Sequence, residues 1–268
     1  MTKKMSKGTK KGKEKSIKGI TKKNVYEGYE KDFWNEKRDD LSSLLLLPKI
    51  NSLLDFVYTQ AGILRSKDQH KWVTKDYKPT KVLEIGFGYG GGIIYWSRKG
   101  YDITGVEPDQ RSVDRINQKV HRRAAFCSKI EDFKAMNNYD LIILSHALEH
   151  LPDLDEFFRV ISAMQKNKGA VFIEVPDCEN KETLRDSKSN KAHVYHFTTS
   201  SLTKEFKKHG YNVIKCEELI SKIDQITKKS LPKYKRFARL VKVILAKDKS
   251  VVSTSEKADT IRLLAVKK

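Results

Sequence analysis

The feature that most constrains this chain is a run of glycines directly after an apolar segment, Val82-Leu-Glu-Ile-Gly-Phe-Gly-Tyr-Gly-Gly-Gly92. A strand that ends in such a run and opens a helix is typical of a loop that holds a nucleotide-like ligand. Gly86 permits the tight turn, while Gly88 and Gly90 let the backbone approach the ligand closely. Because Gly91 also completes a G-x-G-x-x-G pattern, the spacing alone leaves a dinucleotide open as the ligand.

Two carboxylates narrow the identity of the ligand. Glu84 lies inside the predicted strand, where a buried acid is costly unless it meets a cation or a hydrogen-bond donor. It would repel a pyrophosphate and attract an ammonium group such as that of a methionine moiety. Glu107 ends the next predicted strand, 17 residues after Gly90, where a carboxylate typically accepts hydrogen bonds from ribose hydroxyls. The pair favours a ligand that combines a ribose with an amino acid.

Downstream of residue 80, short apolar segments alternate with segments of helical periodicity. The predicted strands are 82–86, 102–107, 124–128, 140–145, 170–175, 211–216 and 260–266, and the predicted helices follow the glycines and cover 109–120, 154–165 and 200–209. This alternation predicts an α/β fold with a parallel sheet covered by helices on both faces. Apolar positions at helical spacing over 41–65 predict one or two further helices before the sheet, and 66–80 is expected to be a polar connector.

Charge is distributed unevenly along the 268 residues. The net charge is +20, and residues 1–23 hold ten lysines and one acid, so this tail carries +9 and the rest carries 20 − 9 = +11. With almost no apolar side chains, the tail is expected to be disordered. We therefore divide the chain into a basic tail at 1–23, a helical extension at 24–70 and a catalytic domain at 71–268.

A basic helix is predicted within an insertion at 217–258 that separates the last two strands. Phe237, Leu240, Val241, Ile244 and Leu245 recur at helical spacing with Lys and Arg between them. The apolar stripe would pack on the domain, and the cationic face would be solvated. The alternative is that this face contacts an anionic substrate, a partner or, peripherally, an anionic membrane surface.

Cysteine usage and hydropathy favour a cytoplasmic location. Three widely spaced cysteines fit a reducing compartment and argue against a disulfide framework or a zinc-cysteine site. The apolar run 44–47 is interrupted at Pro48 and is too short to span a bilayer. The lysines of the tail are not followed by the apolar segment of a signal peptide.

Several segments together resemble class I S-adenosylmethionine-dependent methyltransferases, and most closely the small-molecule branch with ubiquinone-pathway and sugar methyltransferases. They are Glu84-Ile-Gly86-Phe87-Gly88-Tyr-Gly90, Glu107-Pro108, Tyr139–His150, Gly169–Asp177 and His193-Val-Tyr-His196-Phe. The resemblance covers about residues 75–216 and the last strand. It implies a Rossmann-like sheet of seven strands, mostly parallel with the last antiparallel, and S-adenosylmethionine as cofactor.

The resemblance also implies roles for single residues. Ile130 and Glu131 would border the adenine, and Ser145 and His146 would line the floor of the pocket. The expected cofactor-binding residues are therefore Glu84, Gly86, Phe87, Gly88, Gly90, Glu107, Pro108, Ile130, Glu131 and Ser145.

Histidines are the expected catalytic groups. Methyl transfer from a sulfonium mainly requires an aligned nucleophile, and a hydroxyl acceptor is helped by a base that titrates near neutrality. His146 and His150 follow the fourth predicted strand, and His193 and His196 follow the fifth, at the sheet edge where ligands bind. We place His150 and His193 first as bases, with a helix cap or a packing role as the alternative for each.

A metal site is the alternative role for these residues. Glu149 beside His150 would orient an imidazole, or it would converge with His150, His193 and His196 on one ion. No pair of ligands has a diagnostic spacing such as H-E-x-x-H, so we expect no metal.

The leading functional hypothesis is O-methylation of a small molecule or of a sugar hydroxyl in a glycan. Segment 145–148 carries neither the Asn/Asp-Pro-Pro-Tyr motif of base methylation nor a nucleophilic cysteine, which disfavours DNA as the substrate. One alternative is an RNA methyltransferase that uses the basic tail and helix to hold phosphates. A second is a protein that binds the cofactor without turnover. The oligomeric state is left open.

Overall fold

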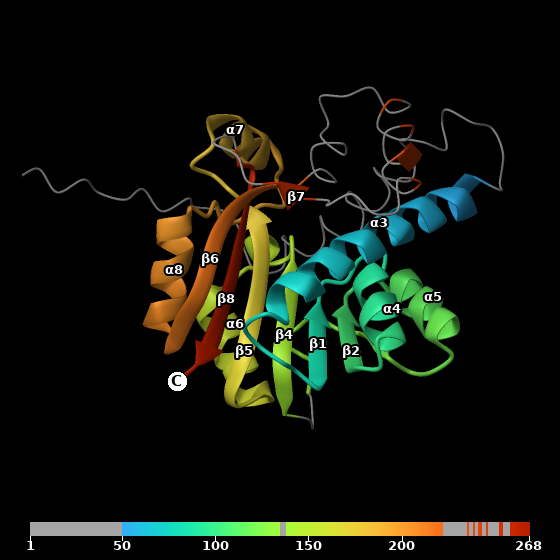
Figure 1. Cartoon of the computed structure of the whole chain (residues 1–268), viewed down its shortest axis with the longest axis horizontal. Helices are drawn as coiled ribbons and strands as arrows, with labels where there is room; N and C mark the ends of the chain where they lie inside the picture. The colour runs from blue at the N-terminus through green and yellow to red at the C-terminus, as the bar shows by residue number, and fades with distance from the viewer. Residues whose placement is uncertain are drawn as a thin grey trace, which may run out of the picture.

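The computed structural model describes residues 50–134, 138–221 and 258–268, together with residues 235, 238, 241, 242, 245 and 252–253. Figure 1 shows the arrangement of the helices and strands. In chain order they are α3 (Ile50–Val73), β1 (Lys81–Ile85), α4 (Gly91–Arg98), β2 (Asp102–Glu107), α5 (Gln110–Val120), β3 (Ala125–Cys127), β4 (Tyr139–Ser145), the 3-10 turn η2 (Leu148–His150), α6 (Leu154–Met164), β5 (Gln165–Pro176), α7 (Lys181–Ser189), α8 (Thr199–Lys208), β6 (Tyr211–Ser221), β7 (Val252–Ser253) and β8 (Thr260–Lys267).

The strands form one mixed sheet in the order β3-β2-β1-β4-β5-β8-β6-β7. Strands β1 to β5 pair in parallel, and β8 runs antiparallel between β5 and β6. The α/β prediction with an antiparallel last strand is confirmed, and the two-residue β7 is an edge strand that the sequence pattern did not predict. The strand order reverses between β1 and β4, and ligands of open α/β sheets bind at such a point, beyond the carboxyl ends of the strands.

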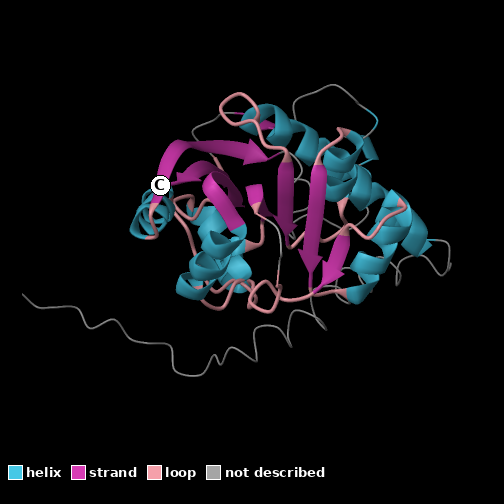
Figure 2. Ribbon diagram, turned by 90° about the horizontal axis from the view of Figure 1, so that it is seen from below, coloured by secondary structure: helices cyan, strands magenta, loops and turns pink. Residues whose placement is uncertain are grey.

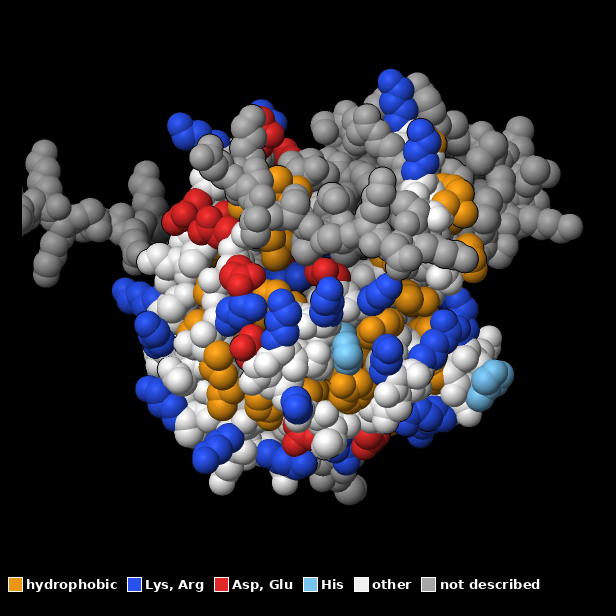
Figure 3. Space-filling model, in the orientation of Figure 1, with side chains coloured by type: hydrophobic (Ala, Val, Ile, Leu, Met, Phe, Trp, Pro, Cys, Tyr) orange, Lys and Arg blue, Asp and Glu red, His pale blue; other side chains and the backbone are white. Residues whose placement is uncertain are grey.

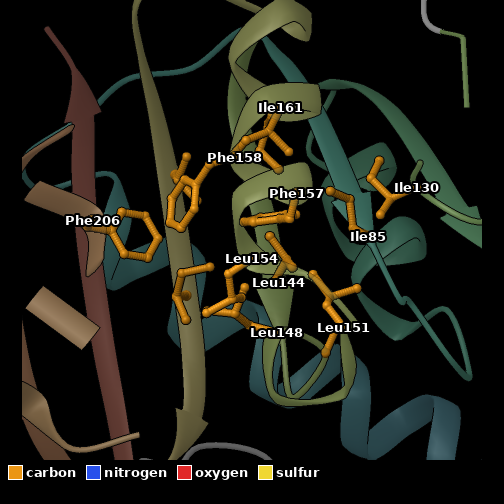
Figure 4. Packing of buried hydrophobic residues seen from close by; sticks show 14 of the residues in the cluster. Ile85, Ile130, Leu144, Leu148, Leu151, Leu154, Phe157, Phe158, Ile161 and Phe206 are labelled. Atoms are coloured by element: carbon orange, nitrogen blue, oxygen red, sulfur yellow. The ribbon is translucent and has the colours of Figure 1, made fainter. Parts of the chain in front are cut away.

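Helices cover both faces of the sheet, with α3, α4 and α5 on one side and α6 and α8 on the other (Figures 1 and 2). Because side chains alternate along a strand, each central strand supplies both layers. Leu144 packs with Phe157 of α6 and Phe206 of α8 (Figure 4), whereas Leu141 and Ile143 pack on the α4 side. Burial on both faces explains why 140–145 is almost continuously apolar.

The N-terminal helix is longer than predicted. Residues 66–73, expected to belong to a polar connector, continue α3 to Val73. Ser66, Gln69 and Trp72 lie three residues apart on one buried face of this helix. The prediction of a connector was wrong for residues 66–73. Polar side chains occupy part of the buried face of the helix, and such a face is not recognised by its apolar periodicity.

Two further differences concern the C-terminal half. Helix α7 was not predicted, since its sequence is almost entirely polar. Strand β6 extends to Ser221, so 217–221 belongs to the sheet and the insertion begins after it. The basic tail 1–23 lies outside the described residues, as does most of the predicted basic helix, although its described positions 235, 238, 241, 242 and 245 are helical.

A buried ionic group joins α3 to the sheet. Arg262 of β8 is 1% exposed, and its guanidinium donates to Glu174 Oε2 at 2.7 Å and to Asp68 Oδ2 at 2.6 Å. Gln69 also donates to Glu174, at 3.2 Å. Three segments far apart in the sequence therefore share one set of buried charges.

Replacing Arg262 should leave the carboxylates of Glu174 and Asp68 without their guanidinium partner. We expect Arg262→Met to lower the free energy of unfolding by about 3–5 kcal/mol, because a broken buried pair leaves an uncompensated charge. Arg159→Met, which removes the exposed pair with Glu156, is the control and should leave the free energy of unfolding nearly unchanged. Urea unfolding followed by circular dichroism measures both variants, and equal losses would contradict the structural role of Arg262.

Candidate active site

The glycine loop joins β1 to α4 and is built on left-handed backbone. Gly86, Gly88 and Gly90 have φ values of 70°, 52° and 71°, a region that side chains with a Cβ rarely adopt. A Cβ on Gly90 would also lie 2.1 Å from the Cδ1 of Ile116 in α5. The Gly86 N–H donates to the carbonyl of Val106 at 2.9 Å, which fixes the loop against β2.

Glu84 points under this loop and is 7% exposed. A Cβ at position 92 would lie 2.2 Å from Glu84 Oε1, so Gly92 makes room for the carboxylate. Within the described part of the chain, Oε2 of Glu84 has no hydrogen-bond partner. Burial, with a smaller contribution from the charge of Glu107, raises the pKa of Glu84 to about 8. A buried acid without a donor fits the ammonium group of S-adenosylmethionine.

Glu107 closes the end of β2 and is fully buried. It accepts hydrogen bonds from the N–H groups of Gly88 at 2.9 Å and Asp109 at 3.4 Å. Burial raises its pKa to about 7, although these two hydrogen bonds act in the opposite direction. Its carboxylate thus stands beside the glycine loop, where it fits the hydroxyls of a ribose.

A half-open pocket of about 490 Å³ lies beside the loop. Its wall is formed by Ile85, Gly86, Val106, Pro108, Ser128, Lys129, Ile130, Ala147, His150 and Leu151. Of the ten expected cofactor residues, Gly86, Pro108 and Ile130 belong to this wall and the other seven do not. Lys129 and Leu151 are wall residues that the sequence analysis missed; their only signal is that each lies shortly after a predicted strand.

Phe87, Glu131 and Ser145 do not belong to this wall. The ring of Phe87 is buried and packs against Gly105 of β2. Ser145 accepts a hydrogen bond from Gln69 Nε2 of α3 at 2.9 Å. The cofactor-binding roles of Phe87, Glu131 and Ser145 stay predictions.

Helix α3 and Arg115 brace the loop from outside, which the sequence did not indicate. Arg115 donates to the Gly88 carbonyl at 3.3 Å and pairs with Asp55 of α3 at 3.1 Å. The ring of Tyr58 in α3 stacks on that of Tyr89 at a centroid distance of 4.8 Å. The N-terminal extension therefore shapes the cofactor loop.

His150 is the one predicted catalytic histidine in the pocket wall. Its Nδ1 lies 2.9 Å from the carbonyl oxygen of Ala192. A carbonyl can only accept, so Nδ1 carries the proton and Nε2 of the neutral ring carries the lone pair. That tautomer is the one a base with its Nε2 toward a substrate requires.

His193 and His196 lie behind His150 and share one partner. Ser187 Oγ is 2.7 Å from His193 Nδ1 and 2.9 Å from His196 Nδ1. Burial is the main cause that lowers the pKa of His193 to about 4, and burial together with Lys188 lowers the pKa of His196. Both rings are therefore neutral near pH 7.

His146 has a different environment. Its Nδ1 lies 3.5 Å from Glu149 and its Nε2 lies 3.7 Å from Glu174, both buried carboxylates. Its backbone adopts φ = 53° and is held by a 2.7 Å hydrogen bond to the Glu174 carbonyl. Because both ring nitrogens face acids of the protein, we place His146 below His150 as a base.

Three of the four groups in the metal reading come together. The ligand-type atoms of Glu149, His150 and His193 lie within 4.8 Å of one another, and His196 is not in this group. Nδ1 of His150 and Nδ1 of His193 have protein partners, the Ala192 carbonyl and the Ser187 hydroxyl. The expectation that no metal takes part stays a prediction.

Comparison with known proteins decides the family. A family model described as a methyltransferase domain matches residues 26–216, more than half of the chain. The chain belongs to this methyltransferase family. The enzyme is an S-adenosylmethionine-dependent methyltransferase, as the glycine loop, Glu84 and Glu107 predicted.

Curated relatives match only part of the chain. The ubiquinone biosynthesis O-methyltransferase of Nitrobacter winogradskyi is 26% identical over 136 residues, 49% of this chain and 51% of the relative. That of Bordetella avium is 28% identical over 156 residues, 54% of this chain and 58% of the relative. The chain thus spans about half the length of these relatives.

Solved structures share the fold. The 1,6-didemethyltoxoflavin-N1-methyltransferase of Burkholderia thailandensis, solved with S-adenosylhomocysteine, aligns with a TM-score of 0.57 at 12% identity over 94% of this chain and 93% of that one. A SAM-dependent methyltransferase from Archaeoglobus fulgidus aligns with a TM-score of 0.55 at 16% identity over 76% and 93%. At these identities the likeness shows the fold alone. Among the described helices of our methyltransferase, none has the length and apolar content needed to cross a bilayer.

Replacing Glu84 tests the ammonium site. We expect Glu84→Gln to weaken S-adenosylhomocysteine binding roughly 10- to 100-fold, because the neutral amide loses the charge-assisted contact. Isothermal titration calorimetry measures the dissociation constant. Asp102 lies at the start of β2, at the other end of the strand from Glu107. Asp102→Asn is therefore the control and should bind S-adenosylhomocysteine with the affinity of the wild type. Unchanged affinity in Glu84→Gln would remove Glu84 from the cofactor site.

Cofactor affinity should also depend on pH. The pKa values of Glu84 and Glu107, about 8 and about 7, lie above the ordinary value of a carboxyl group. Since the ammonium group binds the ionised form of Glu84, protons compete with it below about pH 8. The affinity for S-adenosylhomocysteine should therefore fall as the pH is lowered from about 8.5 to about 6. Calorimetry across this range checks the direction, and a flatter profile in Glu84→Gln assigns the effect.

Proposed function

We propose that the enzyme methylates a hydroxyl group of a small molecule, with His150 as the general base. The observation that carries this proposal is the position of His150 in the pocket wall with its Nδ1–H held by the Ala192 carbonyl. A general base must reach the proton that it removes and must be unprotonated when it does so. With the Nδ1 proton held by the Ala192 carbonyl, Nε2 is the nitrogen at which the neutral ring accepts a proton.

Each part of the site then has one task. The cofactor supplies a methyl group on a sulfonium, which is already activated for transfer. Glu84 holds its ammonium group, Glu107 accepts from its ribose, and the glycine loop provides close backbone contact. Nε2 of His150 takes the proton of the acceptor hydroxyl as the new O–C bond forms. Neutral His193 behind it leaves His150 free of a neighbouring positive charge.

Two observations favour a small acceptor over RNA. The curated relatives are named ubiquinone biosynthesis O-methyltransferases. On the face in Figure 3, Lys and Arg side chains are spread over the described surface with Asp and Glu among them, rather than gathered in one stripe. A sugar hydroxyl is the alternative acceptor within the same chemistry.

The test combines an acceptor panel with one substitution. Catechol, phenol, nucleotide-sugars, an oligosaccharide, RNA and a protein extract are incubated with enzyme and methyl-labelled cofactor. We expect label on a small hydroxyl compound, and a kcat in His150→Gln reduced roughly 10²- to 10⁴-fold by the loss of the base. The dissociation constant of S-adenosylhomocysteine is measured for the same variant, so that a loss of turnover is distinguished from a loss of cofactor binding.

His121→Gln is the matched control, because this histidine lies at the exposed C-terminal end of α5. It should keep wild-type turnover. Label found on RNA or protein alone would overturn the small-molecule acceptor. A His150→Gln variant with wild-type kcat would overturn the base.

A further inference from the structure

We propose that His193, Ser187 and His196 form a proton exit path that leads from His150 to the surface of the protein. The proposal rests on the function proposed above, because it takes His150 as the group that receives the proton. It assigns Ser187 and His196, which touch neither ligand, a positioning role in resetting the base.

The path begins at the wall of the cofactor pocket. The ring of His150 contacts that of His193 edge-on, at a centroid distance of 4.6 Å and an interplanar angle of 80°. A nitrogen of each ring and an oxygen of Glu149 lie within 4.8 Å of one another. A single water molecule bridges polar atoms at such a spacing. The first transfer therefore needs one bridging water.

Glu149 stabilises positive charge at this first step. It is 1% exposed, and burial alone would raise its pKa. The hydrogen bond to His146 and the charges of His146, His150 and His193 outweigh burial and hold the pKa of Glu149 below its usual value. An ionised carboxylate thus lies beside both rings while a proton moves between them.

The second step runs through one hydroxyl group. Ser187 Oγ lies 2.7 Å from His193 Nδ1 and 2.9 Å from His196 Nδ1. A hydroxyl has one proton to donate and also accepts at its oxygen, and the path requires that it donates to one ring and accepts from the other. In that arrangement the two imidazoles are opposite tautomers. Ser187 itself is 4% exposed and lies on α7, whose first turn is capped by Asn180.

The path ends in solvent. His196 is exposed and lines an open pocket of about 730 Å³ together with Asp153, Asp155 and Glu205. The lowered pKa values of His193 and His196 mean that neither ring retains a second proton near pH 7. The residues of this path lie on α7 and the segment after it and reach the surface at α6 and α8, away from the wall that an acceptor would cover.

The proton count balances. His150 receives one proton at Nε2 from the acceptor hydroxyl and passes it through the bridging water to Nε2 of His193. Nδ1 of His193 then gives its proton to Ser187 Oγ, and the hydroxyl gives its own to Nδ1 of His196. Nε2 of His196 releases one proton to water. The two rings and the hydroxyl end with reversed polarity. The path is reset when each ring gives up the proton on one nitrogen to water and regains one from water on the other nitrogen, and the hydroxyl turns back.

The first experiment needs no acceptor. Long-range ¹H–¹⁵N correlation spectra of the full-length protein report the tautomer of each histidine. In the wild type we expect one of His193 and His196 to carry its proton on Nδ1 and the other on Nε2. In Ser187→Ala this opposition should be lost, and in His196→Ala the spectrum of His193 should change. Ser189→Ala, in the same helix and outside the path, should leave both rings as in the wild type.

The second experiment measures turnover with the acceptor that the panel identifies. In dilute buffer, kcat of Ser187→Ala and His196→Ala should fall roughly tenfold with KM unchanged, less than the roughly 10²- to 10⁴-fold loss expected for the group that takes the substrate's proton directly. Concentrated imidazole should restore kcat in His196→Ala, because it replaces an exposed proton acceptor. Ser189→Ala should match the wild type in either buffer.

The outcomes separate the two proposals. Unchanged tautomers in Ser187→Ala, or a kcat in both path variants equal to that of Ser189→Ala, would overturn the exit path. If His150→Gln still loses turnover in that case, the base assignment stands and only the path fails. If His150→Gln keeps full turnover, the proposed function fails first.

Discussion

The structure depends on the buried pair between Arg262 and Glu174. Arg262 comes from the antiparallel strand β8, which enters the sheet between β5 and β6, and it reaches Asp68 on α3 across 194 positions of sequence. Glu174 in turn contacts Gln69 of α3 and lies beside His146 after β4. One ionic group therefore fixes the helix that braces the cofactor loop and the turn that carries the histidines. A buried pair of this kind adds little net stability by itself, but its geometry allows few alternative arrangements.

Four of the buried carboxylates at or near the carboxyl edge of the sheet fall into two classes. Glu149 and Glu174 have cationic or histidine partners within the protein, which hold their pKa values below the usual range. Glu84 and Glu107 lack such a partner at short range, and burial raises their pKa values to about 8 and about 7. The first class holds the scaffold together. In the second class Glu107 has two backbone N–H donors, and a ligand that brings a cation and hydroxyl donors would offset the remaining cost of burial of both groups.

A feature could be predicted from the sequence when the interactions that form it join residues close together in the chain. The glycine loop, Glu84 and Glu107 were recognisable because they depend on the local order strand, turn and helix. The continuation of α3 through Gln69 was missed because its buried face is polar and is satisfied by Ser145 and Glu174. Ser187 and Arg262 gave no signal, since their partners are set by tertiary packing and a serine or an arginine has no periodicity of its own.

The roles of the two histidines after β4 could not be distinguished from the sequence for the same reason. His146 and His150 are four residues apart and lie on the same edge, so their sequence environments are nearly equivalent. The structure distinguishes them by what each Nδ1 meets: a carboxylate oxygen of Glu149 for His146, and the carbonyl of Ala192 for His150. A carbonyl fixes a neutral tautomer, whereas a second carboxylate at Nε2, from Glu174, surrounds His146 with negative charge. Under the proposed function, the histidine that accepts the proton is thus selected by a backbone group 42 positions away, supplied by the segment between α7 and α8.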